Sequence, residues 1–137
     1  MWTKTIASIV AALSLAGASL AASTGVDALR GARRVLLVSA PASDDPQLRV
    51  QRKTLAGWRE AARDRDVTVV QIVGDAVQGA SDAAGALRTR YGLPEGSFAA
   101  ALVGKDGHVA LRSAEPVTSA DLRRTIDAMP MRRAGQR

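Results

Sequence analysis

The architecture of this chain can be worked out from one stretch, RVLLVSAPASDDPQL, which runs from Arg34 to Leu48. A continuous apolar run, Val35 to Val38, is typical of a strand buried on both faces of a sheet. A loop from Ser39 to Asp45 follows, in which Asp45 predicts an N-cap and Pro46 predicts the first residue of a helix. Because sites in open α/β sheets lie beyond the carboxyl ends of the strands, this loop is the first place to look for one.

Outward from this stretch, apolar periodicity and turn signals predict alternating helices and strands. The first strand should end at Ala40, and a helix should start at Pro46, with an apolar stripe on Leu48, Leu55, Trp58 and Ala62 and solvated charges at 63–66 that close it. We then expect a strand Val67–Val73 and a helix Ala83–Tyr91 capped by Ser81 or Asp82. The remaining elements are a strand Ser97–Val103, a hairpin turn at 104–107, a strand His108–Arg112 and a helix from the Thr118 cap to Pro130. The order β-α-β-α-β-β-α is that of the thioredoxin fold. It predicts an α/β architecture, a four-stranded mixed sheet with helices on both faces.

Composition limits both the size of the protein and its chemistry. The chain has 137 residues, of which 47% are apolar and 3% aromatic, so we expect one domain with a core of Val, Leu, Ile and Ala. Cysteine is absent, which excludes disulfides and thiol chemistry.

The N-terminal residues have the pattern of a secretion signal. Lys4 supplies a positive charge, the apolar run Ile6 to Leu20 follows, and small residues offer cleavage near Ala22. The run is short for a membrane anchor, which needs roughly 20 apolar residues, although a retained anchor is the alternative. We therefore expect a periplasmic or secreted protein. The predicted organisation is a signal peptide at 1–22, a polar lead-in at 23–32, a domain at 33–130 and a basic tail at 131–137.

The net charge of +6 invites a nucleic-acid hypothesis, so its location matters. Between Val35 and Asp127 we count 12 basic and 12 acidic residues, and the excess lies at the two ends. The end residues are Arg30, Arg33, Arg34, Arg132, Arg133 and Arg137. Since a nucleic-acid surface needs a basic stripe on the folded body, we expect no specific nucleic-acid binding. Solvated tails are the favoured interpretation, and contact with an envelope protein or an anionic surface such as lipid headgroups is the alternative.

Four segments together carry a resemblance to a known family. They are the opening stretch, DVTVVQIVGD at 66–75, YGLPEGSFAAALVGKDGHVALRSAEP at 91–116 and DLRRTIDAMPMRR at 121–133. They resemble the DUF4174 domain, found in small exported bacterial proteins and in some animal extracellular matrix proteins. The hairpin GKDG and the ending IDAMPMRR are the most specific parts. The resemblance implies export and a thioredoxin-like fold close to peroxiredoxins. It implies no catalytic residues, because the family has no established activity.

We call the loop Ser39–Asp45 and the start of the following helix the loop mouth, because thioredoxin-like proteins carry their redox cysteine there. In this chain Ser43 and Asp44 occupy that stretch, and a serine needs an activating base. Nothing in the sequence places the one histidine, His108, beside Ser43. Asp44 and Asp45 are more simply a helix cap than a cation site, since the spacing of a calcium loop is missing.

Two residues on the predicted first helix complete the candidate site. Gln51 shares the apolar face with Leu48 and Leu55, and a buried amide must be hydrogen-bonded. We expect it to hold the backbone beneath Ser39–Ser43, or alternatively to contact a ligand. Arg52 is adjacent and offers a charge at the loop mouth. The candidate ligand-binding residues are Ser43, Asp44, Gln51 and Arg52.

The sequence contains no motif that names a reaction. GxGxxG, GxxxxGK[ST], HExxH and GxSxG are all missing, so we expect no catalytic residues, no cofactor and no metal. The favoured hypothesis is a non-catalytic binding or interaction module of the cell envelope. The alternative is an enzyme with a non-thiol site at the loop mouth, using Ser43, Asp44 and Arg52, and a third is an adhesion-type module. A concave polar cleft at the loop mouth would favour the enzyme, and a filled surface with an apolar patch elsewhere would favour the interaction module.

Overall fold

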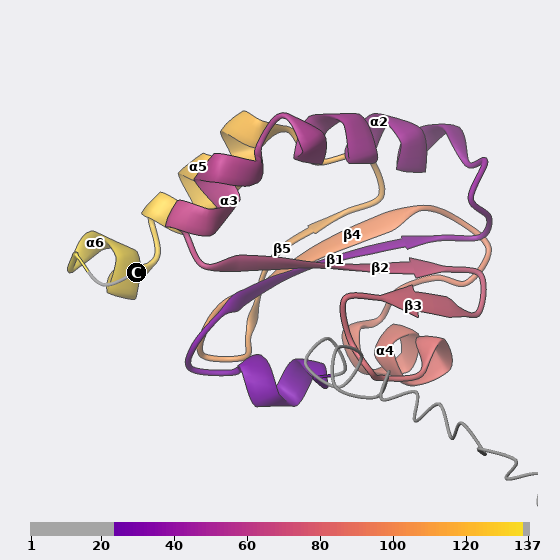
Figure 1. Cartoon of the computed structure of the whole chain (residues 1–137), viewed down its shortest axis with the longest axis horizontal. Helices are drawn as coiled ribbons and strands as arrows, with labels where there is room; N and C mark the ends of the chain where they lie inside the picture. Colours follow the sequence, from indigo (N-terminus) through magenta and orange to yellow (C-terminus); the bar gives the residue numbers. More distant parts are fainter. Residues whose placement is uncertain (1–23, 136–137) are drawn as a thin grey trace, which may run out of the picture.

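The computed structural model describes residues 24–135, so the predicted signal peptide at 1–22 lies outside the described residues. The described chain alternates strands and helices (Figure 1). In chain order the elements are η1 (Val26–Leu29), β1 (Arg34–Ala40), α2 (Pro46–Ala56), α3 (Arg59–Asp64), β2 (Val67–Val73), β3 (Ala76–Gln78), α4 (Ala84–Tyr91), β4 (Ala99–Val103), β5 (Val109–Ser113), α5 (Ser119–Asp127) and α6 (Pro130–Arg133).

The strands form one mixed sheet in the order β3-β2-β1-β4-β5. The predicted parallel pair is confirmed, because β1 runs alongside β2 with Arg34 opposite Val67 and Ala40 opposite Val73. β4 is antiparallel to β1 and continues through the hairpin into β5. The prediction of four strands is wrong: the sheet has five. Gly74, with φ of 56°, and Asp75 make a two-residue turn that folds β3 back on β2, and three residues are too few to give a clear period-two signal.

Helices cover both faces of the sheet, as predicted. Figure 1 shows α2, α3 and α5 on one face, and α4 with η1 on the other. Alternation along β1 divides its side chains between two cores, Val35 and Leu37 facing α4, and Leu36 and Val38 facing α2 and α5. All seven residues of β1 are buried; the apolar run indicates this for Val35–Val38, whereas the burial of Arg34 and Ser39 goes beyond it.

The long helix expected after Pro46 is two helices. α2 ends at Ala56, and α3 begins at Arg59 after the cap at Trp58. Glycine at position 57 weakens the helix, and the break lets Trp58, only 2% exposed, pack into the core as predicted. The charges at 63–66 are not uniformly solvated. Arg65 and Asp66 are partly buried, and Asp66 adopts a left-handed φ of 51° that turns the chain into β2.

Both ends of the domain are more structured than the sequence predicts. The polar lead-in contains η1, whose Val26 is 4% exposed and packs in the core facing α4. Asp82, expected as a helix cap, instead accepts a hydrogen bond from Val26 N at 2.8 Å, and Ala83 occupies the cap position of α4. At the other end Pro130 starts a further helical turn, α6, after α5 has ended at Asp127.

Residues 24–135 contain no helix with both the length and the apolar character that a bilayer crossing requires.

Candidate functional site

The loop mouth is an exposed turn that caps a helix. Asp45 Oδ1 accepts a hydrogen bond from Leu48 N at 3.0 Å, which confirms the predicted N-cap of α2. Ser43 and Asp44 are exposed on the surface of the turn. Asp45 therefore does what the cap interpretation predicts, and Asp44 is exposed beside it. Among residues 24–135, no group of three histidine or acidic side chains could hold a metal ion.

The carboxyl ends of β1 and β2, from which this turn starts, are held by Arg88, a residue that sequence reasoning missed. Its Nε donates to Ser39 Oγ at 3.1 Å, and its two terminal nitrogens donate to Gly74 O at 2.6 Å and Ala40 O at 3.3 Å. Arg88 is only 6% exposed, so a buried guanidinium ties the carboxyl ends of β1 and β2 to α4. Helical spacing could have indicated that Arg88 is buried, because it follows Ala84 by four residues and therefore lies on the apolar face of α4.

Gln51 is buried and fully bonded, as expected, but its partner differs from the prediction. Its Nε2 donates to Val117 O at 3.0 Å, and its Oε1 accepts from Val117 N at 2.7 Å. The expected contact with the backbone of 39–43 is therefore wrong. The physical reason is that the segment before α5 packs in the core beside the buried face of α2, so the Gln51 side chain meets Val117 there.

Arg52 also points away from the loop mouth. Its Nε donates to Gln71 Oε1 at 2.8 Å on β2, so the side chain lies over the sheet beside α2. Ser43 and Asp44 remain on the exposed turn, while Gln51 and Arg52 have other partners. The structure therefore does not bring the four candidate residues together into one site.

His108 lies at the opposite end of the sheet from Ser43. The register places Val103, just before the hairpin, opposite Val35 at the start of β1, whereas Ser43 follows the end of that strand. The His108 side chain is 82% exposed, and its Nδ1 lies 3.4 Å from Asp106 Oδ2. A Ser43–His108 pair is therefore ruled out by topology.

A cavity of about 400 Å³ opens at that opposite end. We call it the hairpin cavity, because it lies between the β4–β5 hairpin and the segment joining α5 to α6. Its walls are formed by Arg34, Gly104, Lys105, Asp106, His108, Val109, Ala110, Met129, Pro130 and Met131. Most of the wall is apolar, and cationic side chains lie at its inner end.

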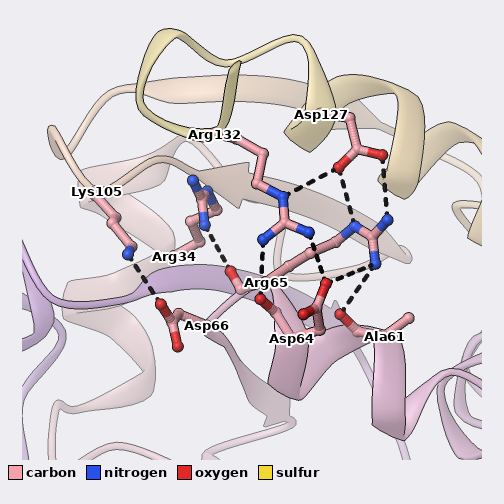
Figure 2. A network of polar contacts seen from close by, with 8 residues as sticks. All are labelled: Arg34, Ala61, Asp64, Arg65, Asp66, Lys105, Asp127 and Arg132. Atoms are coloured by element: carbon pink, nitrogen blue, oxygen red, sulfur yellow. Dashed lines mark hydrogen bonds and ion pairs between the residues drawn. The ribbon is translucent and has the colours of Figure 1, made fainter. Parts of the chain in front are cut away.

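A network of charged side chains surrounds this end of the sheet (Figure 2). Lys105, expected to be a simple turn residue, is only 8% exposed and donates from Nζ to Asp66 Oδ2 at 3.0 Å. Arg65 binds both oxygens of Asp127 at 3.1 Å, and Arg132 reaches Asp64 Oδ2 at 2.6 Å. These partners hold the carboxylates ionised: the hydrogen bond from Lys105 lowers the pKa of Asp66, and that from Arg65 lowers the pKa of Asp127.

The network corrects the expectation of solvated basic tails. Arg34 is only 1% exposed within β1, and Arg33 Nε donates to Thr68 Oγ1 at 2.6 Å. Arg132 is partly buried and paired with Asp64, whereas Arg30 and Arg133 are exposed. Within residues 24–135, Arg33, Arg34 and Arg132 are therefore part of the folded body. Charge counting along the sequence cannot find this, because it does not show which basic residues the sheet and α6 enclose.

These observations define an α/β domain with a thioredoxin-like arrangement whose loop mouth carries no thiol. The chain belongs to the family described as Domain of unknown function (DUF4174), which matches residues 26–135. No curated protein matches it. Among solved structures it is similar to the reduced 2-Cys peroxiredoxin of Plasmodium vivax, with a TM-score of 0.58 and 15% identity over 75% of this chain and 80% of that one. At this identity the similarity shows the fold alone.

Proposed function

We propose that this protein is an exported, periplasmic binding module that uses a thioredoxin-like scaffold without catalysis. The observation that carries the proposal is the structural use of the polar groups at the loop mouth. Ser39 is hydrogen-bonded to Arg88, Gln51 to Val117, and Arg52 to Gln71. Ser43 and Asp44 are left on an exposed turn, and His108 is at the other end of the sheet.

A reaction at this loop would need a nucleophile and an activating group in contact. The chain has no cysteine, and a serine hydroxyl is a weak nucleophile unless a base takes its proton. Asp44 is exposed to solvent beside Ser43, and no histidine is available at this end of the sheet. Binding needs neither group, which is why we favour it over the alternative of a non-thiol enzyme.

Turnover assays test the non-catalytic part of the proposal. The purified chain should reduce neither hydrogen peroxide nor an insulin disulfide, and should hydrolyse neither p-nitrophenyl acetate nor p-nitrophenyl phosphate above the rate of buffer. Ser43→Ala and Asp44→Ala are the matched variants. Turnover that either variant abolishes would establish the enzyme alternative and overturn the proposal.

Fractionation tests the exported part. The pattern Lys4 followed by the apolar run Ile6–Leu20 supports cleavage near Ala22. Expression of the full-length gene product in a bacterial host should therefore yield a periplasmic protein whose N-terminus is Ala22 or Ser23. An uncleaved chain in the cytosolic fraction would contradict export, and an uncleaved chain in the membrane fraction would indicate the retained anchor.

A further inference from the structure

The hairpin cavity has one cationic side chain for which the network supplies no carboxylate. Figure 2 draws four cations, Arg34, Arg65, Lys105 and Arg132, with three carboxylates, those of Asp64, Asp66 and Asp127. Lys105 pairs with Asp66, and Arg65 and Arg132 share the other two. Among residues 24–135, Arg34 forms no ion pair with any carboxylate, so the network has an excess of one positive charge.

Arg34 is also unusually well buried for such a group. It is 1% exposed, and its partners within residues 24–135 are Arg65 O, at 2.6 Å from one terminal nitrogen, and Met129 Sδ, at 3.2 Å from Nε. A thioether is a weak acceptor, and a guanidinium has five N–H donors. Burial and the repulsion of Arg132 lower the pKa of Arg34, although Asp66 and Asp127 act in the opposite direction from a distance. A buried charge of this kind is costly unless an anion reaches it.

The cavity gives an anion a route to this guanidinium and an apolar wall beside it. Arg34 and Lys105 line the inner end, and Val109, Met129 and Met131 contribute apolar surface. Met131 is among the few large apolar side chains that the fold exposes, at 39%. Methionine adapts its shape to an aliphatic chain more readily than branched residues do. About 400 Å³ is within the range of roughly 300–1,000 Å³ typical of small-molecule sites.

We propose that the hairpin cavity binds an aliphatic monocarboxylate, whose carboxylate pairs with Arg34 and whose chain lies against Met129 and Met131. The inference rests on the proposed binding role and names its ligand class. Lys105 adds positive potential, although Asp66 already accepts its hydrogen bond. Asp106 is the opposing charge at the rim, where its Oδ1 accepts from His108 N at 2.9 Å and its side chain is 67% exposed. Solvent therefore weakens its repulsion, whereas Arg34 acts inside the protein.

Calorimetric titration with three probes separates the charge of the ligand from its chain. Octanoate carries both features, 1-octanol keeps the chain without the charge, and acetate keeps the charge without the chain. We expect octanoate to bind about 10- to 100-fold more tightly than 1-octanol, because the ion pair is lost. We expect it to bind at least about 100-fold more tightly than acetate, because the apolar contacts are lost. Equal affinity for octanoate and either control probe would overturn the proposal, as would no binding of octanoate.

Substitutions in the cavity wall test whether octanoate binds in the hairpin cavity. Arg34→Met should weaken octanoate binding about 10- to 100-fold. Its effect on the unfolding temperature should be small, since the lost hydrogen bond to Arg65 O is offset by removal of a buried charge that no carboxylate pairs with. The matched control is Arg33→Met, because Arg33 neighbours Arg34 but lies outside the cavity wall. Ala110→Phe places a ring in the cavity from an exposed position on β5 and should abolish binding with the fold unchanged.

The variants decide the question even if Arg34→Met does not fold, because Ala110→Phe leaves the charged network untouched. Octanoate affinity unchanged in Ala110→Phe would overturn the proposal. Failure here is distinguishable from failure of the proposed function. A chain that does not bind octanoate and catalyses nothing remains a binding module with another ligand, whereas turnover that Ser43→Ala or Asp44→Ala abolishes removes the binding role whatever octanoate does.

Discussion

Gln51 and Val117 form two hydrogen bonds with each other. The side-chain amide of Gln51 on α2 pairs with the backbone N–H and C=O of Val117, in the way that a residue of a neighbouring strand would. The Gln51 amide donates to Val117 O at 3.0 Å, and Val117 N donates to the Gln51 carbonyl at 2.7 Å. Gln51 is fully buried, and Val117 is 4% exposed just before the cap of α5. The pair therefore fixes where α5 starts relative to α2, on the face of the sheet that the two helices share.

Replacing Gln51 should destabilise the fold strongly, even when the new side chain has the same volume. Gln51→Met keeps the volume and leaves both polar groups of Val117 buried without a partner, which should cost about 3 kcal/mol of unfolding free energy. Urea denaturation followed by circular dichroism measures it. Gln47→Met is the matched control, because Gln47 donates to Ala114 O at 3.3 Å at an exposed position and should cost less than about 0.5 kcal/mol. Equal effects of the two variants would show that the Gln51 pair is not special.

The buried guanidinium of Arg88 predicts a second strong effect. Arg88→Met removes three donors and leaves Ser39 Oγ and two carbonyls without them, so we expect a loss of about 2–4 kcal/mol. Arg88→Lys should recover part of this, because an ammonium group donates to fewer of these positions at once. The matched control is Arg90→Met on the same helix. Arg90 pairs with Asp27 at the surface, where solvent screens the pair, so this variant should cost much less than Arg88→Met.

The order of elements was predictable because each rests on local signals that tertiary contacts did not override. The apolar run of β1, the Asp45-Pro46 start of α2 and the Thr118 cap of α5 all occur as predicted. β3 was missed because its pairing with β2 depends on the turn at Gly74 rather than on a pattern of its own. The break at Trp58 was missed because the helical spacing of apolar residues continues through it, although the helix itself is interrupted there.

The polar contacts of the site were much less predictable than the fold. Helical spacing could indicate that Gln51 is buried, but its partner Val117 is 66 residues away in the sequence. The same holds for Arg88 and Ser39, which are 49 residues apart. Arg34 was counted with a basic tail because its charge was visible and its burial was not. Long-range pairing decides which polar side chains are enclosed, and one sequence shows no direct trace of it.

Gly79 should tolerate no side chain, whereas Gly85 should benefit from one. Gly79 has φ of 94°, and a Cβ there would lie 2.5 Å from Val69 O. Gly79→Ala must therefore strain the backbone beside β2, and we expect a loss of at least about 1–2 kcal/mol. Gly85 lies within α4 with no atom near a new Cβ, so Gly85→Ala should gain about 1 kcal/mol through helix propensity. Thermal unfolding measures both, and a stable Gly79→Ala would mean that the turn after β3 can rearrange.

Acid should weaken the protein through the charged network. The hydrogen bond from Lys105 lowers the pKa of Asp66, and the hydrogen bond from Arg65 does the same for Asp127. A carboxylate whose pKa is lower in the folded state than its unfolded value of about 3.9 stabilises the fold above that pH. The contribution is lost as pH falls through the folded-state pKa. We therefore expect the unfolding free energy to decrease as pH drops below about 4.

Asp66→Asn isolates one of these contributions. Asparagine tolerates the left-handed backbone at this position, so the variant removes the charge without straining the turn. It should cost about 1–2 kcal/mol at pH 7, since Lys105 loses the anion that compensates its burial. The difference from the unaltered chain should shrink in acid, because Asp66 is then protonated in both states. Lys105→Met is the reciprocal variant and should remove the same part of the pH dependence. A stability gap that stays constant from pH 7 to about pH 2.5 would show that the Asp66–Lys105 pair does not act electrostatically.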